Sequence, residues 1–262
     1  VGLNTGDATT AGTRLTLLGT AAGRGNITTD GIGTVAVGYA AYSIGTSGIG
    51  NTVVGYEALD AETQGDYNTV LGYQALTDQN GVNGTVANTA VGYLAGANVT
   101  TAVRNTIVGA NALTTATTGG YNSILGESAG GNATTASGSV FLGFQAGLNL
   151  TTGNQNIAIG SQAMHGAAVT GDNNIAIGNQ AGKELTSGNE NIFIGTDAGG
   201  TTTAGTHIVA IGRKAAQANI TTDGSYSVFI GGFAGNQITS GQANVAIGYG
   251  ALDAEDDGDY NT

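Results

Sequence analysis

A triplet of mostly apolar residues recurs along the chain, each time followed directly by a glycine. The residue just before this glycine is aliphatic in every copy, the one before that is apolar, and the first of the three is Val, Ile, Thr or Ser. Short β-branched runs bounded by glycine are typical of β-strands. We call the glycine that ends each triplet the marker glycine, and the copies are Gly19, Gly38, Gly55, Gly72, Gly92, Gly109, Gly126, Gly143, Gly160, Gly178, Gly195, Gly212, Gly231 and Gly248.

The spacing of the marker glycines predicts how these strands are arranged. Nine of the thirteen spacings are 17 residues, and the others are 18, 19, 19 and 20. A fixed period of this size indicates a solenoid, in which each repeat contacts mainly its neighbours. The sequence therefore predicts an all-β fold, a parallel β-solenoid (β-roll) of about 14 coils with a mostly 17-residue repeat.

Three further positions, numbered from the marker glycine, repeat with the strand. Alanine stands at +3 in all fourteen copies, where a methyl group fits between backbone segments and a larger side chain would overpack. Glycine stands at −7 in eleven copies, for example Gly65 and Gly153, where we expect a positive φ at a corner. Asparagine stands at −4 in nine copies, for example Asn51 and Asn156, and its amides should form a ladder between coils and bond the turn backbone.

Both faces of the strand are apolar, although successive side chains of a strand point to opposite faces. One face can line the interior of the coil, whereas the other would leave a large apolar strip on the surface, which is unusual in a soluble monomer. We therefore expect the chain to associate with copies of itself through this strand. Phe141, Phe193 and Phe229, in the middle of their triplets, should be buried within the coil or at that interface.

A longer period lies above the coil repeat. Residues 11–69 align without gaps to residues 204–262, an offset of 193, with 30 identities in 59 positions. Asn261 and Thr262 open a further copy of the motif. We expect residues 1–262 to form a single continuous solenoid array that is a fragment of a longer protein.

The composition excludes several classes of protein. Glycine makes up 48 of 262 residues and proline is absent, which rules out collagen. The net charge is −12, and the six basic residues form no stripe, so we expect no nucleic-acid partner. The chain has no cysteine, and no stretch approaches the length of a membrane span or reads as a signal peptide.

The motif resembles a known family of repeats. Asn156-Ile157-Ala158-Ile159-Gly160, with Ala163 after it, is similar to the head repeats of YadA-like trimeric autotransporter adhesins. The form Asn-Thr-Ala-Val-Gly-Tyr at residues 88–93 resembles repeats of phage tail fibres and large bacterial surface proteins. The resemblance implies left-handed coils, a homotrimer with the apolar strand at its axis, and an extracellular location on a cell surface or virion. This chain departs from that family in its longer repeat and in showing no coiled-coil stalk or membrane anchor.

One acidic segment could hold calcium. Asp253, Glu255, Asp257 and Asp259 alternate along the chain with a glycine at 258, and calcium prefers several oxygen ligands at alternate positions. The segment departs from the usual calcium loop, since Glu255 stands where Asp or Asn is preferred. The alternative is an ordinary solvated acidic loop without a metal.

Other candidate features have equally simple structural readings. Five Asn-X-Thr-Thr segments fit either glycosylation acceptors or a polar turn that recurs with the repeat, and they begin at Asn26, Asn98, Asn132, Asn149 and Asn219. Four tyrosines each follow a marker glycine and could stack as a carbohydrate platform or for stability alone; they are Tyr39, Tyr56, Tyr73 and Tyr93. His165 and His207, the only histidines, fall in no catalytic or metal-binding spacing, so the sequence predicts neither an enzyme nor a cofactor site.

The pattern as a whole favours a structural fibre segment of an extracellular adhesin, surface filament or phage tail fibre. Such a segment would project a distal element or mediate multivalent attachment to a cell-surface glycan or protein receptor. The alternative is a solenoid with a specific ligand face that binds calcium, a glycan or ice. A flat Thr-X-Thr array, which an ice-binding face would favour, is missing from the triplets.

Overall fold

The computed structural model describes residues 2–28, 31–221, 225–254 and 256–262. These residues contain β-strands, turns and bends and no helix, so no helix in this part of the chain could cross a membrane. The chain divides into two compact units, Val1–Thr135 and Ala136–Thr262. Each unit is a parallel β-solenoid, which confirms the predicted fold class.

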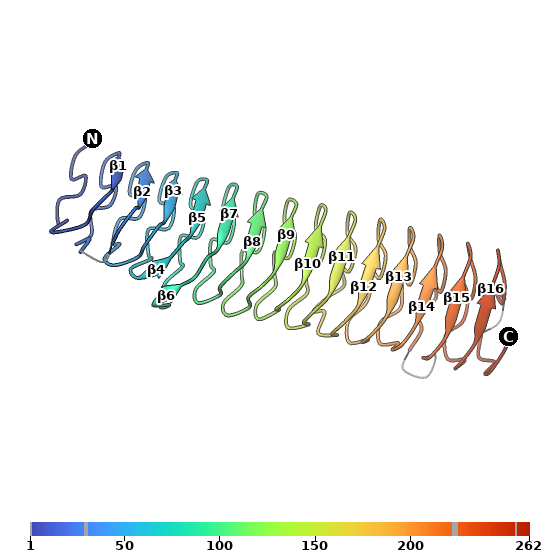
Figure 1. Ribbon diagram of the computed structural model, residues 1–262. Coiled ribbons are helices and arrows are strands. Elements are labelled where there is room, and N and C mark those ends of the chain that lie inside the picture. The colour runs from blue at the N-terminus through green and yellow to red at the C-terminus, as the bar shows by residue number, and fades with distance from the viewer. Residues whose placement is uncertain (1, 29–30, 222–224, 255) are drawn as a thin grey trace. The chain divides into compact units, whose positions relative to one another are not determined.

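The first unit contains seven strands that pair in parallel, in chain order, along one sheet (Figure 1). Every triplet lies in register with the next, so that Thr52 pairs with Thr69 and Val54 with Leu71. A short second sheet joins β4 (Gly65–Asp66) to β6 (Gly84–Thr85). The seven strands are β1 (Thr16–Leu18), β2 (Val35–Val37), β3 (Thr52–Val54), β5 (Thr69–Leu71), β7 (Thr89–Val91), β8 (Thr106–Val108) and β9 (Ser123–Leu125).

The second unit repeats the same architecture with a further seven parallel strands (Figure 1). The register is again that of the repeat, with Ile157 opposite Ile175 and Ile159 opposite Ile177. The strands are β10 (Val140–Leu142), β11 (Ile157–Ile159), β12 (Ile175–Ile177), β13 (Ile192–Ile194), β14 (Val209–Ile211), β15 (Val228–Ile230) and β16 (Val245–Ile247).

The core of each unit is built from the middle residue of each strand and the alanine at +3. Phe141, Phe193 and Phe229 are fully buried inside their coils, so of the two places predicted for these rings the structure shows the interior. Ala163 and the equivalent alanines are also fully buried, except Ala251 in the last coil, which is half-exposed. The alanine column thus lies at a tightly packed position, as the repeat predicts.

The marker glycine is required by backbone crowding. Gly160 has a φ of 127°, and a Cβ atom there would lie 2.5 Å from the carbonyl oxygen of Gly178 in the next coil. Real side chains do not tolerate either condition. All fourteen marker glycines have such a positive φ, and the close approach recurs along the stack, although Gly248 in the last coil has no atom that near.

The glycine at −7 corrects one sequence-based expectation. Gly65 and Gly153 do not have a positive φ. A Cβ atom at Gly153 would instead lie 2.3 Å from the carbonyl oxygen of Gly171, which occupies the same position one coil on. The expectation was wrong about the cause, because close approach of stacked backbones, and not a left-handed turn, excludes a side chain here.

The asparagines at −4 form the predicted ladder. The Asn51 Oδ1 atom accepts hydrogen bonds from the backbone N–H of Asn68 at 2.8 Å and from its side-chain Nδ2 at 3.1 Å. The Asn51 Nδ2 atom donates to the carbonyl oxygen of Gly65 at 2.8 Å. Each buried amide therefore joins the strand of one coil to the corner of the next.

Candidate functional site

Each unit carries a row of outward-facing side chains along its sheet, which we call the outer strip. It consists of the first and third residues of every strand, at −3 and −1, while the residue between them is buried in all strands but β1. The strip side chains are half-exposed or exposed within one chain. None of them is charged.

In the second unit the outer strip is entirely aliphatic. The exposed fraction of the strip residues reaches 68 % at Ile247, in the last coil. A continuous surface of this composition is characteristic of a site that another molecule covers. The strip residues are Val140, Leu142, Ile157, Ile159, Ile175, Ile177, Ile192, Ile194, Val209, Ile211, Val228, Ile230, Val245 and Ile247.

In the first unit the same strip has a hydroxyl row beside an aliphatic row. The residue at −3 is Thr or Ser in every strand except β2, where it is Val35, whereas the residue at −1 is Leu or Val. Four of the threonine hydroxyls, on β3, β5, β7 and β8, make no hydrogen bond within the described residues, namely Thr52, Thr69, Thr89 and Thr106. The two units therefore present chemically different strips from the same strand motif.

Two exposed columns flank the strip along the chain, one at +1 and one at −5. In the first unit the +1 column contains Tyr39, Tyr56, Tyr73 and Tyr93, which we call the tyrosine ladder. Successive ring centroids lie 5.0, 5.1 and 5.6 Å apart, with interplanar angles of 14°, 5° and 20°. The rings cover one another's faces, so the open ring faces of a carbohydrate platform are not presented by Tyr56 and Tyr73, and the exposed parts are ring edges and hydroxyls.

A polar cluster adjoins the middle of the ladder. Interaction with the neighbouring Glu57 carboxylate raises the pKa of the Tyr56 phenol above its ordinary value. The Gln74 Nε2 atom of the next coil donates to the Glu57 Oε2 atom at 2.8 Å. This arrangement places a proton acceptor beside one ring of the ladder.

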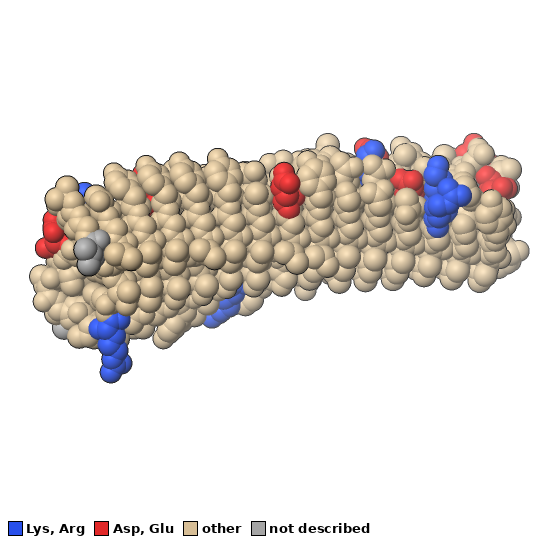
Figure 2. Space-filling view, turned by 90° about the horizontal axis from the view of Figure 1, so that it is seen from above, with Lys and Arg blue, Asp and Glu red and all other residues tan. Residues whose placement is uncertain are grey.

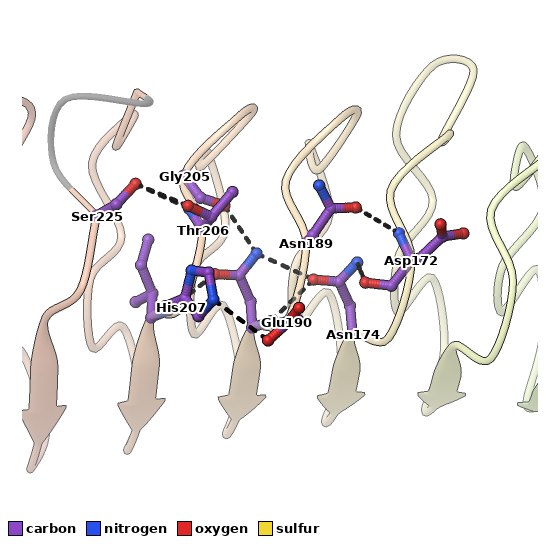
Figure 3. Close-up of polar contacts among 10 residues, drawn as sticks. Asp172, Asn174, Asn189, Glu190, Gly205, Thr206, His207 and Ser225 are labelled. Carbon is purple, nitrogen blue, oxygen red and sulfur yellow. Dashed lines mark hydrogen bonds and ion pairs between the residues drawn. The ribbon is translucent and has the colours of Figure 1, made fainter.

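The −5 column contains further aromatic and basic contacts of the surface. In the second unit the His207 Nε2 atom lies 3.2 Å from the Glu190 Oε2 atom (Figure 3). The His207 ring also stacks on Tyr226, with the ring centroids 4.7 Å apart. In the first unit the Arg104 guanidinium lies 5.3 Å from the centroid of the Tyr121 ring and donates to its hydroxyl. These pairs join neighbouring coils along the surface.

Figure 3 also shows that polar ladders continue into the corner of the coil. The Asn189 Oδ1 atom accepts from the backbone N–H of Asp172 at 2.8 Å, and the Ser225 Oγ atom accepts from that of Thr206 at 3.0 Å. Side chains in this corner, Asn189 and Ser225, thus bind backbone N–H groups of neighbouring coils.

The interior of the first unit contains a polar group that sequence analysis missed. Glu62 is fully buried, and its Oε1 atom accepts hydrogen bonds from the backbone N–H groups of Thr63, Gln64 and Gly65, while its Oε2 atom has no partner. Burial raises the pKa of Glu62, although these three N–H groups oppose the shift. The hydroxyl of Tyr42 is also buried without a partner, and desolvation together with the Glu62 charge raises the pKa of this phenol.

The repeat contains only a partial signal for these buried groups. Glu62 stands at +7, where seven of the other coils have apolar residues, such as Val99 and Leu150, and the rest have Gly, Asn, Gln, Thr or Glu. Gly45 stands at +7 in the preceding coil, and a Cβ atom there would lie 2.0 Å from the Tyr42 ring. Alignment of the coils by column therefore shows the missing side chain that leaves space for the tyrosine, whereas the burial of Glu62 depends on the coils around it.

The proposed calcium loop is only partly covered by the structure. Glu255 lies outside the described residues, and Asp253 and Asp257 are exposed. The Asp259 Oδ1 atom accepts a hydrogen bond from the backbone N–H of Gln242 at 2.7 Å. In the part of the chain that the structure describes, no three His, Cys, Asp or Glu side chains come together as a metal site.

The described residues of the Asn-X-Thr-Thr segments lie in turns and loops between strands, while Thr29 and Thr222 lie outside the described residues. The Asn26 Oδ1 atom accepts a hydrogen bond from the Thr10 hydroxyl, and the Asn219 Oδ1 atom accepts one from the Thr203 hydroxyl. Both contacts suit a recurring turn, and glycosylation stays a hypothesis.

His165 is half-buried, and its backbone carbonyl oxygen accepts a hydrogen bond from the Asn149 Nδ2 atom.

Charge is sparse on the surface that Figure 2 shows, where most of the visible area is uncharged. Comparison with protein-family models and with curated protein sequences gives no match. The resemblance to adhesin head repeats therefore stays a prediction, and so do the trimer and the handedness that this resemblance implies.

Proposed function

We propose that this chain is a structural fibre segment of an extracellular adhesin, surface filament or phage tail fibre, in which further copies of the chain cover the outer strip in a homotrimer. The observation that carries the proposal is the aliphatic outer strip of the second unit. Its −3 and −1 positions are Val, Ile or Leu in all seven strands. A soluble chain gains most by burying such a surface.

A second copy of the chain fits this surface better than an unrelated partner. Each coil repeats the strand at the inter-strand spacing of about 4.8 Å, so only another stack with the same spacing can pack against it rung after rung. The strip is uncharged, which keeps the net charge of −12 away from the contact. Association costs roughly 4–15 kcal/mol in lost translational and rotational freedom. This cost does not grow with the number of coils, whereas each further coil adds apolar contact.

The function that follows is mechanical and multivalent. A stacked array presents the same surface turns many times along its length. Weak contacts from repeated turns to a glycan or protein receptor would combine into a high overall affinity. The chain would thereby hold a distal element away from its point of attachment, or attach through its own turns.

The solution mass of the chain tests the proposal. We expect the wild-type chain to be trimeric at micromolar concentration and the double variant Ile177→Lys/Ile194→Lys to be monomeric, because two buried charges would lie in the interface. The matched control is Thr152→Lys/Ser187→Lys, which adds the same charge at exposed turn positions of the same unit and should stay trimeric. A monodisperse wild-type monomer would refute the proposal.

A specific ligand face in the first unit is the second candidate function. It is favoured by the four threonine hydroxyls without partners, which lie in register beside an aliphatic row and the tyrosine ladder. Such a surface offers both hydroxyl and apolar contacts to an extended glycan. Affinity electrophoresis in polysaccharide gels would show retardation of the wild-type chain and none of a Thr69→Val/Thr89→Val variant. Equal mobility of the two would exclude this candidate.

A further inference from the structure

The tyrosine ladder has a geometry that the proposed function does not use. Its four rings belong to consecutive coils of the first unit and are nearly parallel. Their exposed fractions are 49 % at Tyr39, 42 % at Tyr56, 45 % at Tyr73 and 52 % at Tyr93. The rings are thus accessible from solvent along their edges while each remains in contact with its neighbour.

The backbone keeps these rings together. The backbone N–H of Glu57 donates to the Tyr39 carbonyl oxygen at 2.8 Å, and that of Gln74 donates to the Tyr56 carbonyl oxygen at 2.8 Å. The N–H of Leu94 donates to the Tyr73 carbonyl oxygen at 3.0 Å. Two groups held side by side in this way react as if each were present at very high concentration.

We propose that the tyrosine ladder is a site of oxidative cross-linking, at which neighbouring rings of one chain couple to dityrosine. Each of two phenols loses one electron and its hydroxyl proton to give a phenoxyl radical. The two radicals join through a carbon–carbon bond between positions ortho to the hydroxyls, and the displaced ring hydrogens move to the phenoxyl oxygens, which restores both phenols. The oxidant is hydrogen peroxide acting through a haem peroxidase, and it takes up the two electrons and two protons to form two molecules of water.

The cluster around Tyr56 favours oxidation at the centre of the ladder. Oxidation of a phenol is easier when its proton leaves with the electron, and the Glu57 carboxylate that acts on the Tyr56 phenol is placed to receive that proton. Gln74 holds this carboxylate from the adjacent coil. Tyr56 has a ring on either side of it, Tyr39 and Tyr73, with which its radical can couple.

Other exposed tyrosines lack such neighbours and serve as internal controls. Tyr67 has Gly50 and Ala87 at its position in the adjacent coils, and Tyr226 has His207 and Ala243. Neither can couple to a tyrosine of the next coil.

The test is oxidation of the full chain with horseradish peroxidase and hydrogen peroxide. We expect dityrosine fluorescence in the gel band that migrates at the mass of a single chain under denaturing conditions. Fluorescence in this band shows coupling within one chain, whereas coupling between copies would give bands of higher mass. Cleavage after Glu57 and Glu62 should leave the fragments that contain Tyr56 and Tyr73 joined, as mass spectrometry would show.

Two variants decide the outcome, and phenylalanine keeps the stacked ring in both. Tyr56→Phe/Tyr73→Phe should lose nearly all of the single-chain fluorescence, because Tyr39 and Tyr93 are then separated by two coils. Tyr67→Phe/Tyr121→Phe should keep the wild-type yield. Dityrosine found only in covalent oligomers, or an equal single-chain yield in both variants, would overturn the proposal and leave the fibre function untouched.

Discussion

At the scale of single residues, the core is specified by size complementarity within a coil. Phe193 occupies the middle of its strand, and Gly199 stands at +4 of the same coil, where a Cβ atom would lie 2.6 Å from the Phe193 ring. In the next coil both positions are alanine, Ala210 and Ala216, and Ala216 has a φ of 50°. A large residue in the strand is thus matched by a missing side chain in the turn.

This pairing predicts a coupled effect of substitution. Gly199→Ala should destabilise the chain by about 1–3 kcal/mol, because the added methyl group overlaps the Phe193 ring. In a Phe193→Ala background the same change should cost less, by a coupling energy of roughly 1 kcal/mol. Urea denaturation of the wild type, the two single variants and the double variant measures this coupling energy. An equal cost of Gly199→Ala in both backgrounds would contradict the prediction.

Glu62 makes the stability of the first unit depend on pH. Its pKa in the folded chain is raised above the ordinary value of 4.5, so the folded state holds its proton to higher pH than the unfolded state does. The stability linked to this proton is therefore fully present below pH 4.5 and is lost as the pH rises through the folded pKa.

We expect the stability of the Glu62→Gln variant to depend less on pH over this range, because the glutamine amide does not titrate. Thermal unfolding followed upward from pH 4.5 would measure the difference between wild type and variant. Glu127→Gln, at an exposed position of the same unit, should keep the wild-type slope. If the two variants behave alike, Glu62 does not carry the effect.

At the scale of the element, a three-residue strand is too short to be stable alone, and the asparagine ladder supplies what it lacks. The Asn174 Nδ2 atom donates to the Gly188 carbonyl oxygen at 2.8 Å and to the Asn156 Oδ1 atom at 3.1 Å. Its Oδ1 atom accepts from the backbone N–H of Asn191 at 3.0 Å. The amide therefore satisfies backbone groups at the strand and at the corner together.

Asn174→Ala should destabilise the second unit by about 2–4 kcal/mol, since it leaves buried backbone groups without partners. Asn174→Ser should cost less, because the chain already uses serine at this position: the Ser139 Oγ atom accepts from the Asn156 N–H at 3.1 Å. Urea denaturation and amide hydrogen exchange around β12 measure both changes. Asn179→Ala, at an exposed position, is the control, and an equal loss there would contradict the role of the ladder.

At the scale of the whole molecule, the outer strip and the net charge act in opposite directions on assembly. The strip favours association through apolar burial, whereas chains that each carry a net charge of −12 repel one another. The six basic residues are too few to form a complementary surface.

This balance predicts that salt strengthens self-association. Raising the ionic strength from about 0.01 to 0.15 M shortens the Debye length from roughly 30 to 8 Å and screens the repulsion. Sedimentation equilibrium across this range should show a rising association constant. A falling constant would mean that attractive ion pairs, and not apolar contacts, hold the copies together.

Much of this protein was determined by the sequence itself. The marker glycines, the alanine column and the asparagine column each recur once per coil, and in a stack of coils equal sequence positions become spatial neighbours. The strands, their parallel register, the buried phenylalanines and the amide ladder could therefore be predicted, because local pattern and long-range contact share one period.

Other features were decided only by the tertiary structure. The glycine at −7, as at Gly153, is required by the backbone of another coil, and a turn preference read along the chain suggested a different reason. The burial of Glu62 and the stacking of Tyr56 between two rings also depend on what lies in adjacent coils. All of these features depend on contacts between neighbouring coils. The distance between coils results from how the folded chain stacks, and a pattern read along the sequence does not contain that distance.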